Sequence, residues 1–344
     1  MAERGLLDLA ICRLPVKTRL KTRLALCLER EGDLRGLTRA ALAALCAAPH
    51  DSQGLFDFDS PDSGGADGRK LDAAAIAAAF AAAEGDALVM SRRGIHGVSI
   101  RETVYPPLLK AIYDPPPLLF YRGSLAALAD GGRALAVVGT RRPAAAAMGW
   151  VYQTARELAA AGVCVVSGLA LGIDAQAHRA ALDGGGATCA VLGAAVDEVY
   201  PAAHRQLAQR IVDGGGALVS EYPPGTTARK WQFPERNRII AGLCRATLVV
   251  EAGEKSGALI TADFALEQNR ELLVAARQTA EGVPVFFGEG CRRLAEDGAA
   301  WVDGAGELLA ALGLARPAPR EPAAAFSRAG LSQSLARELG VAGE

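Results

Sequence analysis

The middle of this chain of 344 residues alternates short apolar runs with helical patterns. Apolar runs that alternate with helices are typical of a parallel sheet covered by helices on both faces. Helices are predicted to begin near Ala144, Ile173, His204, Arg236 and Leu259, and strands are predicted at residues 118–121, 135–138, 163–166, 187–192, 217–219, 247–250 and 271–275. The sequence therefore predicts an α/β fold with a Rossmann-like, doubly wound and mostly parallel sheet, whose ligands bind beyond the carboxyl ends of the strands.

The N-terminal part has a different pattern. Leucines recur near helical spacing over residues 5–48, with breaks at Pro15 and Gly32, and predict a small all-helical domain. Residues 49–70 are rich in turn formers and are interpreted as a linker. An alanine-rich helix and a short strand near 88–90 follow. The predicted parts are a helical domain at 1–50, a connecting segment at 51–104, the α/β core at 105–312 and a short tail at 313–344.

Net charge and cysteine spacing exclude several function classes. The formal net charge of −1 argues against a broadly electropositive surface but leaves room for a local basic patch. The seven cysteines lie far apart without a C-x-x-C pair, and the four histidines lack metal-ligand spacing. We expect no metal site and no disulfide framework, and we expect the thiols to be buried in a reducing cytosol.

No segment resembles a leader or a membrane span. The N-terminus lacks a basic region followed by an apolar one, and the longest apolar stretch, residues 73–83, is too short to cross a bilayer. A cytoplasmic protein without a membrane partner is therefore expected.

Two of the predicted strand-exit loops have features of an anion site. Gly139, Thr140 and Arg141 follow the strand at 135–138 and precede a helix, so backbone N–H groups and an arginine can hold a phosphate. An ordinary tight turn with solvated arginines is the alternative. Ser256 and Gly257 stand in a similar position after the strand at 247–250.

The loop at 167–174 raises the question of catalysis. Ser167, Asp174 and His178 are the residue types of a hydrolase triad, but the G-x-S-x-G nucleophile motif is absent. Asp174 and His178, four residues apart on one helix, are interpreted as a structural pair. A Walker A motif and a G-x-G-x-x-G fingerprint are also absent, so we predict no catalytic residue and no cofactor.

Residues 229–245 are locally basic. Five cations face only Glu235, a local sum of five minus one, or +4: Arg229, Lys230, Arg236, Arg238 and Arg245. Trp231 and Phe233 interleave with them. A single-stranded nucleic acid needs cations along its backbone and rings on which its bases stack. The alternative is that both rings anchor the core and the arginines form a solvated face.

Seven stretches together resemble the DNA processing family, called DprA or Smf: 105–123 (YPPLLKAIYDPPPLLFYRG), 137–143 (VVGTRRP), 166–178 (VSGLALGIDAQAH), 190–201 (AVLGAAVDEVYP), 220–225 (SEYPPG), 233–242 (FPERNRIIAG) and 249–267 (VVEAGEKSGALITADFALE). The resemblance implies an extended Rossmann-like domain with an N-terminal SAM-like helical domain. It also implies a non-catalytic homodimer that binds single-stranded DNA, protects incoming strands and loads the RecA recombinase in natural transformation and recombination.

The resemblance also implies roles for individual residues. Thr140 and Arg141 would hold phosphate, next to Ser167 and Gly168 at the neighbouring helix start. Lys230 would be the pocket lysine and Phe233 the stacking ring. The remaining expected DNA-binding residues shape the pocket, hold the DNA backbone or close the far side: Gly139, Arg236, Asn237, Arg238, Ser256 and Gly257.

The sequence departs from the family pattern at four places. Leu171 stands where many members have arginine, Glu235 where a basic residue is common, and Ala144 where serine is frequent. Residues 275–277 lack the usual Pro-Gly. The tail after 312 is expected to be too short for a winged-helix domain.

Two other functions fit the same sheet. A nucleotide phosphoribohydrolase of the LOG group would need a P-G-G-x-G-T-x-x-E motif, but residues 251–259 read EAGEKSGAL. A module that binds a small nucleotide would use the crevice for a single phosphate group.

Overall fold

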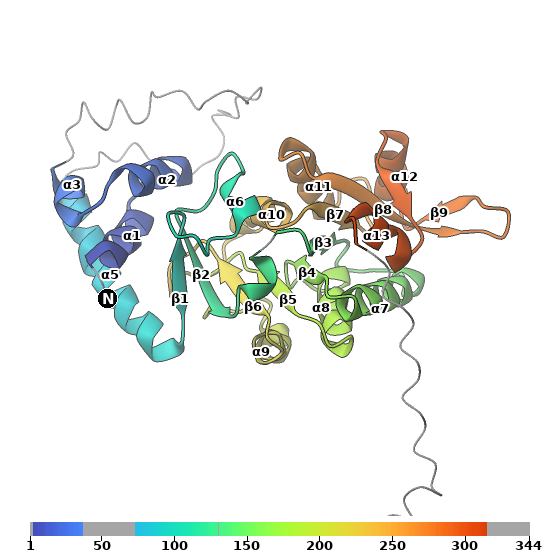
Figure 1. The fold of residues 1–344 in the computed structure, drawn as a ribbon, viewed down its shortest axis with the longest axis horizontal. Coiled ribbons are helices and arrows are strands. Elements are labelled where there is room, and N and C mark those ends of the chain that lie inside the picture. The colour runs from blue at the N-terminus through green and yellow to red at the C-terminus, as the bar shows by residue number, and fades with distance from the viewer. Residues whose placement is uncertain (1–2, 37–72, 130, 315–344) are drawn as a thin grey trace, which may run out of the picture.

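The computed structural model describes residues 3–36, 73–129 and 131–314 (Figure 1). The predicted linker at 49–70, the end of the predicted helical domain and the tail from 315 onward lie outside the described residues.

A large mostly parallel sheet forms the centre of the structure. Its strand order is β1-β2-β6-β5-β4-β3-β7-β8-β10, and β9 pairs with β8. The parallel strands are β3 (Ala134–Val138), β4 (Cys164–Ser167), β5 (Thr188–Val191), β6 (Ala217–Ser220), β7 (Ala246–Val249), β8 (Glu271–Gln278) and β10 (Ala300–Val302). The antiparallel strands are β1 (His96–Ser99), β2 (Leu118–Gly123) and β9 (Pro284–Phe286). All seven predicted strands of the core are confirmed.

The chain reverses its direction of travel across the sheet next to β3. It passes outward from β3 through β4, β5 and β6, then returns to the other side of β3 as β7. In open α/β sheets the loops after two such strands diverge and leave a crevice beyond their carboxyl ends. The crevice is therefore expected between the loops that follow β3 and β7.

Helices cover both faces of the sheet. Figure 1 shows α7 (Ala145–Ala160), α8 (Ile173–Asp183) and α9 (Arg205–Asp213) on one side, and α10 (Gln232–Gly242) and α11 (Gly257–Glu267) on the other. Alternate residues of β3 follow this division: Leu135 and Val137 pack in a cluster with α7 and α8, whereas Ala136 and Val138 pack in one with α10 and α11. The remaining elements are α6 (Pro107–Lys110), α12 (Glu289–Glu296), α13 (Ala305–Ala311), and the short helices η1 (Ala126–Leu128) and η2 (Ala202–His204).

The N-terminal helices are α1 (Glu3–Arg13), α2 (Thr18–Cys27), α3 (Glu31–Arg35) and α5 (Ala73–Arg93). They are tied to the sheet through the segment around β1, because Arg101 donates to Asp8 at 2.6 Å. Thr22 Oγ1 also donates to the Pro115 carbonyl at 2.7 Å. The predicted N-terminal helices are thus present and contact the core directly.

Two local predictions were wrong. The apolar residues 88–90 continue α5 instead of forming a strand. The strand that follows this helix is β1, which pairs with β2 in the sheet. Gly94, with φ of +59°, ends α5 in the left-handed conformation, and Ile95 N donates to the Met90 carbonyl at 3.0 Å. Helix α10 begins at Gln232, four residues before the predicted start at Arg236. Pro234 lies in the first turn of this helix, where a proline is tolerated, so it does not delay the start of the helix.

Helix α5 is longer than the apolar stretch in the sequence suggests. Its 21 residues, with a mean hydropathy of 1.5 over the most apolar part, are long and apolar enough to cross a membrane. The sequence argument from length was therefore wrong. Within this structure Ile76, Phe80 and Ala83 are buried, and the buried Asp86 accepts a hydrogen bond from Arg13 Nε at 2.7 Å, so one side of α5 packs against the protein.

The cysteines in the described part of the chain are free thiols. Cys12, Cys164, Cys189, Cys244 and Cys291 are buried as expected, and burial raises the pKa of Cys164 to about 12. Cys27 is exposed, contrary to expectation, because it ends α2 at the surface.

Candidate nucleic-acid interface

The loops that follow β3, β4 and β7 join into one surface at the carboxyl edge of the sheet. Thr140 N donates to the Glu251 carbonyl at 2.8 Å, and Ile173 N donates to the Thr140 carbonyl at 3.2 Å. Gly172 has φ of +81°, and a Cβ there would lie 2.3 Å from the Thr140 carbonyl oxygen. Only glycine fits this contact. The three loops are therefore held together by their backbones.

The start of α7 already has an anionic cap. Ala144 N donates to Glu251 Oε2 at 2.9 Å, and Arg142 N donates to Thr140 Oγ1 at 3.3 Å. A carboxylate at a helix N-terminus is stabilised by the unpaired N–H groups and the helix dipole. The expected anion site at this helix start therefore has the Glu251 carboxylate beside it. The exposed side chains of Arg141 and Arg142 remain to face a ligand.

Arg236 is buried under this surface. It donates from Nη1 to the carbonyls of Gly168, at 2.6 Å, and Val191, and from Nε to Asn237 Oδ1 at 3.1 Å. A Cβ at residue 168 would lie 2.2 Å from Arg236 Nη2, so this position needs glycine. Arg236 thus joins the ends of β4 and β5 to α10.

The pKa of Arg236 reflects its surroundings. Burial lowers the pKa to about 10, the Asp174 carboxylate raises it, and the positive charge of Arg141 lowers it. The last effect places Arg141 close enough to Arg236 to repel it. The buried guanidinium thus has a carboxylate beside it and an exposed arginine near it.

Arg238 is also buried, on the side of α10 next to the β6 exit loop. It forms a bidentate ion pair with Glu221, at 2.6 and 2.8 Å, and lies 3.7 Å from Asp114. Burial lowers the pKa of Arg238, but the charge and hydrogen bonds of Glu221 outweigh burial and raise the pKa well above its usual range. This guanidinium is neutralised by protein carboxylates.

The predicted exposed charge of +4 over residues 229–245 was therefore wrong. Arg236 and Arg238 point into the protein, and Arg245 precedes β7 at the opposite, amino edge of the sheet, where it donates to the Leu312 carbonyl at 3.4 Å. Arg229 and Lys230 are the exposed cations of this segment that lie on the carboxyl side of the sheet. The sequence shows where charged residues stand along the chain, but it does not show which side of α10 faces the core.

Exposed cations nevertheless gather at the carboxyl edge from three separate loops. Arg141 and Arg142 follow β3, Lys230 follows β6, and Lys255 follows β7. Within the described ranges none of these four forms an ion pair with a carboxylate. Since cations without protein partners can neutralise phosphates, this edge suits a polyanion.

Aromatic rings accompany the cations. Phe233 is half-buried, with its ring centroid 5.3 Å from that of Tyr200, whose side chain is 56% exposed. A Cβ at Gly193 would approach Phe233 Cδ1 to 3.0 Å, so glycine gives this ring its space. Tyr200 was not among the predicted stacking residues. Its position as an aromatic residue in a strand-exit loop is the sequence signal that indicates such a role.

Trp231 is 49% exposed and is not a core anchor. Its ring stands edge-on to Tyr222, with centroids 6.2 Å apart and an angle of 82°. Tyr222 donates its hydroxyl to Glu235 Oε2 at 3.1 Å. Burial and the nearby Glu221 raise the pKa of Glu235, while the hydrogen bond from Tyr222 opposes them.

The other predicted site residues form the floor and walls. Ser167 is fully buried and donates to the Val137 carbonyl at 2.6 Å. Asn237 Nδ2 lies 3.5 Å from the Gly257 carbonyl, and Ser256 caps α11 by accepting from Ala258 N at 3.3 Å. A Cβ at Gly139 would clash with Ile173 at 2.6 Å. The structure thus brings the predicted residues together but buries Ser167, Gly168, Arg236, Asn237 and Arg238.

Of the residues of a hydrolase triad, Ser167 and Asp174 lie close enough for a hydrogen bond, but His178 has another partner. Burial raises the pKa of Asp174, and the hydrogen bond from Ser167 opposes this rise. His178 Nδ1 lies 2.7 Å from Thr188 Oγ1, and burial lowers the pKa of His178 to about 3. Asp174 accepts from Gly168 N at 3.2 Å and from Ala170 N at 3.4 Å. The predicted structural pair of Asp174 and His178 is therefore wrong, because each side chain has another partner. Among the described residues, no group of three or more His, Cys, Asp or Glu side chains could hold a metal.

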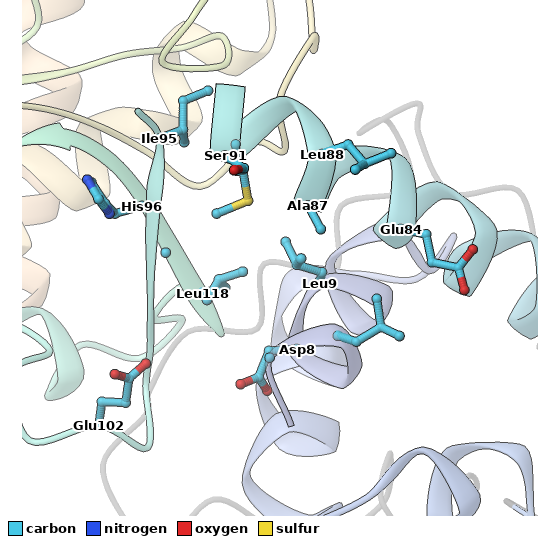
Figure 2. Close-up of a pocket in the computed structure, with 14 residues that line it drawn as sticks. Asp8, Leu9, Glu84, Ala87, Leu88, Ser91, Ile95, His96, Glu102 and Leu118 are labelled. Carbon is cyan, nitrogen blue, oxygen red and sulfur yellow. The ribbon is translucent and has the colours of Figure 1, made fainter. Parts of the chain in front are cut away.

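A cavity of about 770 Å³ lies elsewhere, between α1, α5 and β1 (Figure 2). Its wall is apolar at Leu9, Leu88 and Leu118, and acidic at Glu84 and Glu102. Because carboxylates repel phosphate, this cavity does not suit a nucleotide, and the carboxyl edge remains the candidate interface.

Comparisons with known proteins identify the family of this chain. A family model described as DNA recombination-mediator protein A matches residues 96–313. The protein Smf of Synechocystis sp. is 43% identical over 211 residues, which cover 61% of this chain and 52% of that protein. The DNA processing protein DprA of Bacillus subtilis is 43% identical over 180 residues, which cover 52% of this chain and 60% of that protein. The chain thus spans between half and two thirds of these two relatives.

Two solved structures are also similar. The X-ray structure of DprA from Streptococcus pneumoniae has a TM-score of 0.67 and 30% identity, and the match covers 90% of this chain and 98% of that one. A structure of DprA from Helicobacter pylori, titled for its single-stranded DNA binding mode, has a TM-score of 0.55 and 28% identity, covering 63% and 95%. With residues 96–313 matched by the family model, the chain belongs to the DNA recombination-mediator protein A family.

Proposed function

We propose that this protein binds single-stranded DNA without catalysis, across the carboxyl edge of its sheet, as a recombination mediator. The observation that carries the proposal is the gathering of unpaired cations beside exposed rings. Arg141, Arg142, Lys230 and Lys255 come from three strand-exit loops. Single strands are bound by this combination, in which cations follow the phosphates and rings stack on unpaired bases.

Each predicted residue takes a role that fits its burial. Arg141 and Lys230 contact phosphates, and Phe233 stacks on a base. Gly139 and Thr140 let the DNA backbone approach the β3 exit loop, and Ser256 with Gly257 bounds the far side of the crevice. The buried residues Ser167, Gly168, Arg236, Asn237 and Arg238 shape the surface from below instead of touching DNA.

Membership of the family supports the biological context in the proposal. The Helicobacter pylori relative is described by its single-stranded DNA binding mode. On this basis we include in the proposal that the protein acts in the cytoplasm as a homodimer, protects incoming strands and loads RecA in natural transformation. The proposed domain division keeps a helical N-terminal domain, with the core starting at β1, where the family match begins.

The non-catalytic part of the proposal rests on geometry. Ser167 donates to the Val137 carbonyl and lies beside the buried Asp174, while His178 contacts Thr188, so the histidine that would act as general base is not paired with Ser167. In the phosphoribohydrolase alternative the loop after β7 would supply the carboxylate, but the Glu251 carboxylate is bonded to Ala144 N. Release of free base from AMP by the purified protein would support that enzyme instead.

A competition experiment tests the main proposal. Fluorescence anisotropy with a labelled single-stranded oligonucleotide, competed by unlabelled single- or double-stranded DNA at two salt concentrations, measures both preference and electrostatics. We expect preferential competition by the single strand and a steep loss of affinity with salt, because phosphate neutralisation releases counterions. Equal competition by duplex DNA, or the absence of binding, overturns the proposal.

A further inference from the structure

Helix α10 presents rings on two different sides. Successive residues of an α-helix are about 100° apart, so Phe233 lies about 200° around the helix from Trp231. Phe233 packs beside Tyr200 and Gly193, whereas Trp231 packs against Tyr222. Glu235 follows Trp231 by four residues and therefore lies on the same side as the tryptophan. The side with Trp231, Tyr222 and Glu235 is thus separate from the side with Phe233.

Trp231 is placed to stack. About half of its side chain is exposed, at 49%, and Tyr222 supports the ring edge-on, which holds the ring in place without covering both of its faces. Arg229 and Lys230 precede it in the chain and are exposed. A ring beside free cations is the arrangement expected of one base subsite on a strand.

Glu235 is an unexpected residue for such a surface. One carboxylate oxygen, Oε2, accepts from the Tyr222 hydroxyl at 3.1 Å. The Arg238 guanidinium donates to the backbone carbonyl of Glu235 at 3.3 Å. Its ion pair, however, is with the Glu221 carboxylate. No cation in the described part of the chain forms a salt bridge with the Glu235 carboxylate. Oε1 is left to accept from a ligand.

An unpaired carboxylate repels phosphates, so the group that approaches it must be a hydrogen-bond donor. The bases offer such donors on their edges. Cytosine has an N4 amino group, whereas thymine has an O4 acceptor at the equivalent position. A carboxylate only accepts, so it binds the first edge and repels the second.

We propose that Trp231, Tyr222 and Glu235 form a second base subsite, on the side of α10 away from Phe233, that prefers cytosine to thymine. This inference rests on the proposed binding of single-stranded DNA and adds a base preference to it. Trp231 stacks on the base, Glu235 accepts from its N4 amino group, and Tyr222 fixes the carboxylate. Adenine and guanine also have amino groups, but cytosine and thymine form the pair that is matched in size.

The test compares oligo(dC) with oligo(dT) of equal length, bound to the full chain at pH 8 and constant salt, by fluorescence anisotropy. We expect oligo(dC) to bind roughly five- to tenfold more tightly, at the low end of the discrimination given by one good base contact. Glu235→Gln should bring the ratio of the two dissociation constants close to one, because an amide both donates and accepts. Tyr222→Phe, which keeps the ring, should lower the ratio in part.

Glu198→Gln is the matched control. Glu198 is an exposed carboxylate in the loop after β5, at the same edge of the sheet. Its neutralisation should strengthen binding of both oligonucleotides equally and leave their ratio unchanged. A wild-type ratio near one, or a ratio that Glu235→Gln does not change, overturns the inference while leaving the binding of single strands intact. Failure of both oligonucleotides to bind overturns the proposed function and the subsite with it.

Discussion

The Arg236 guanidinium occupies the space where a side chain of residue 168 would lie, and donates to the Gly168 carbonyl at 2.6 Å. This contact fixes the position of the β4 exit loop relative to α10. The Asp174 carboxylate raises the pKa of Arg236, and the charge of the exposed Arg141 lowers it. The floor of the candidate interface is therefore a buried guanidinium with backbone partners and a neighbouring carboxylate.

Gly168→Ala should destabilise the protein. The new Cβ would lie 2.2 Å from Arg236 Nη2, so the guanidinium must leave its backbone acceptors. Overpacking of this kind costs about 1–3 kcal/mol. Urea denaturation measures the free energy of unfolding. Gly149→Ala, in α7 with open space around the added Cβ, is the control and should stabilise by up to about 1 kcal/mol. Equal effects of the two substitutions would contradict the packing argument.

His178 should make stability depend on pH. Burial lowers its pKa from 6.5 to about 3, so between these values the unfolded chain binds a proton that the folded protein does not. The stability contributed by neutral His178 is complete above pH 6.5 and is lost as the pH falls. Between pH 7 and pH 5 the loss amounts to about 2 kcal/mol. Urea denaturation of wild type and His178→Gln at both pH values should show a smaller loss in the variant. An identical loss would exclude His178 as its source.

Arg141→Ala and Lys230→Ala should each weaken the binding of single-stranded DNA and flatten its salt dependence. Each removes one phosphate contact, which lowers the slope of log K against log salt by about 1. Anisotropy titrations at several salt concentrations measure the slope. Arg245→Ala is the matched control, because this exposed arginine lies at the opposite edge of the sheet. Unchanged affinity in both site variants would remove the phosphate roles.

Phe233→Ala should weaken binding without altering the salt slope. The ring contributes stacking instead of charge, and one stacked base is worth about 1–3 kcal/mol. Phe233→Tyr keeps the ring beside Tyr200 and should retain affinity. The same titrations separate the two effects, since a slope that changes in Phe233→Ala would indicate that the substitution displaces a cation.

The sequence predicted the core strands well because their signal is local. Each parallel strand is a short apolar run, and burial on both faces of the sheet requires this composition. The strand-exit positions of Gly139, Thr140 and Arg141 followed directly from the strand positions. The error at 88–90 arose because a short apolar run also fits a buried stretch of helix.

The electrostatics of the site could not be predicted in the same way. Sequence spacing gave five cations between 229 and 245, but three of them do not face the crevice. The partners of Arg238, Glu221 and Asp114, come from other loops, and Glu251 caps α7 from 107 residues away. Contacts between distant segments carry no local pattern.

For the basic segment at 229–245, the sequence by itself determined that charges and rings alternate after a strand of a parallel sheet. The tertiary structure decided which of them are available to a ligand. Lys230 and Trp231 remain exposed at the start of α10, while Arg236 and Arg238 are buried and bonded to carbonyls and carboxylates. The physical reason is that a buried charge requires partners, and only the folded chain brings those partners within reach.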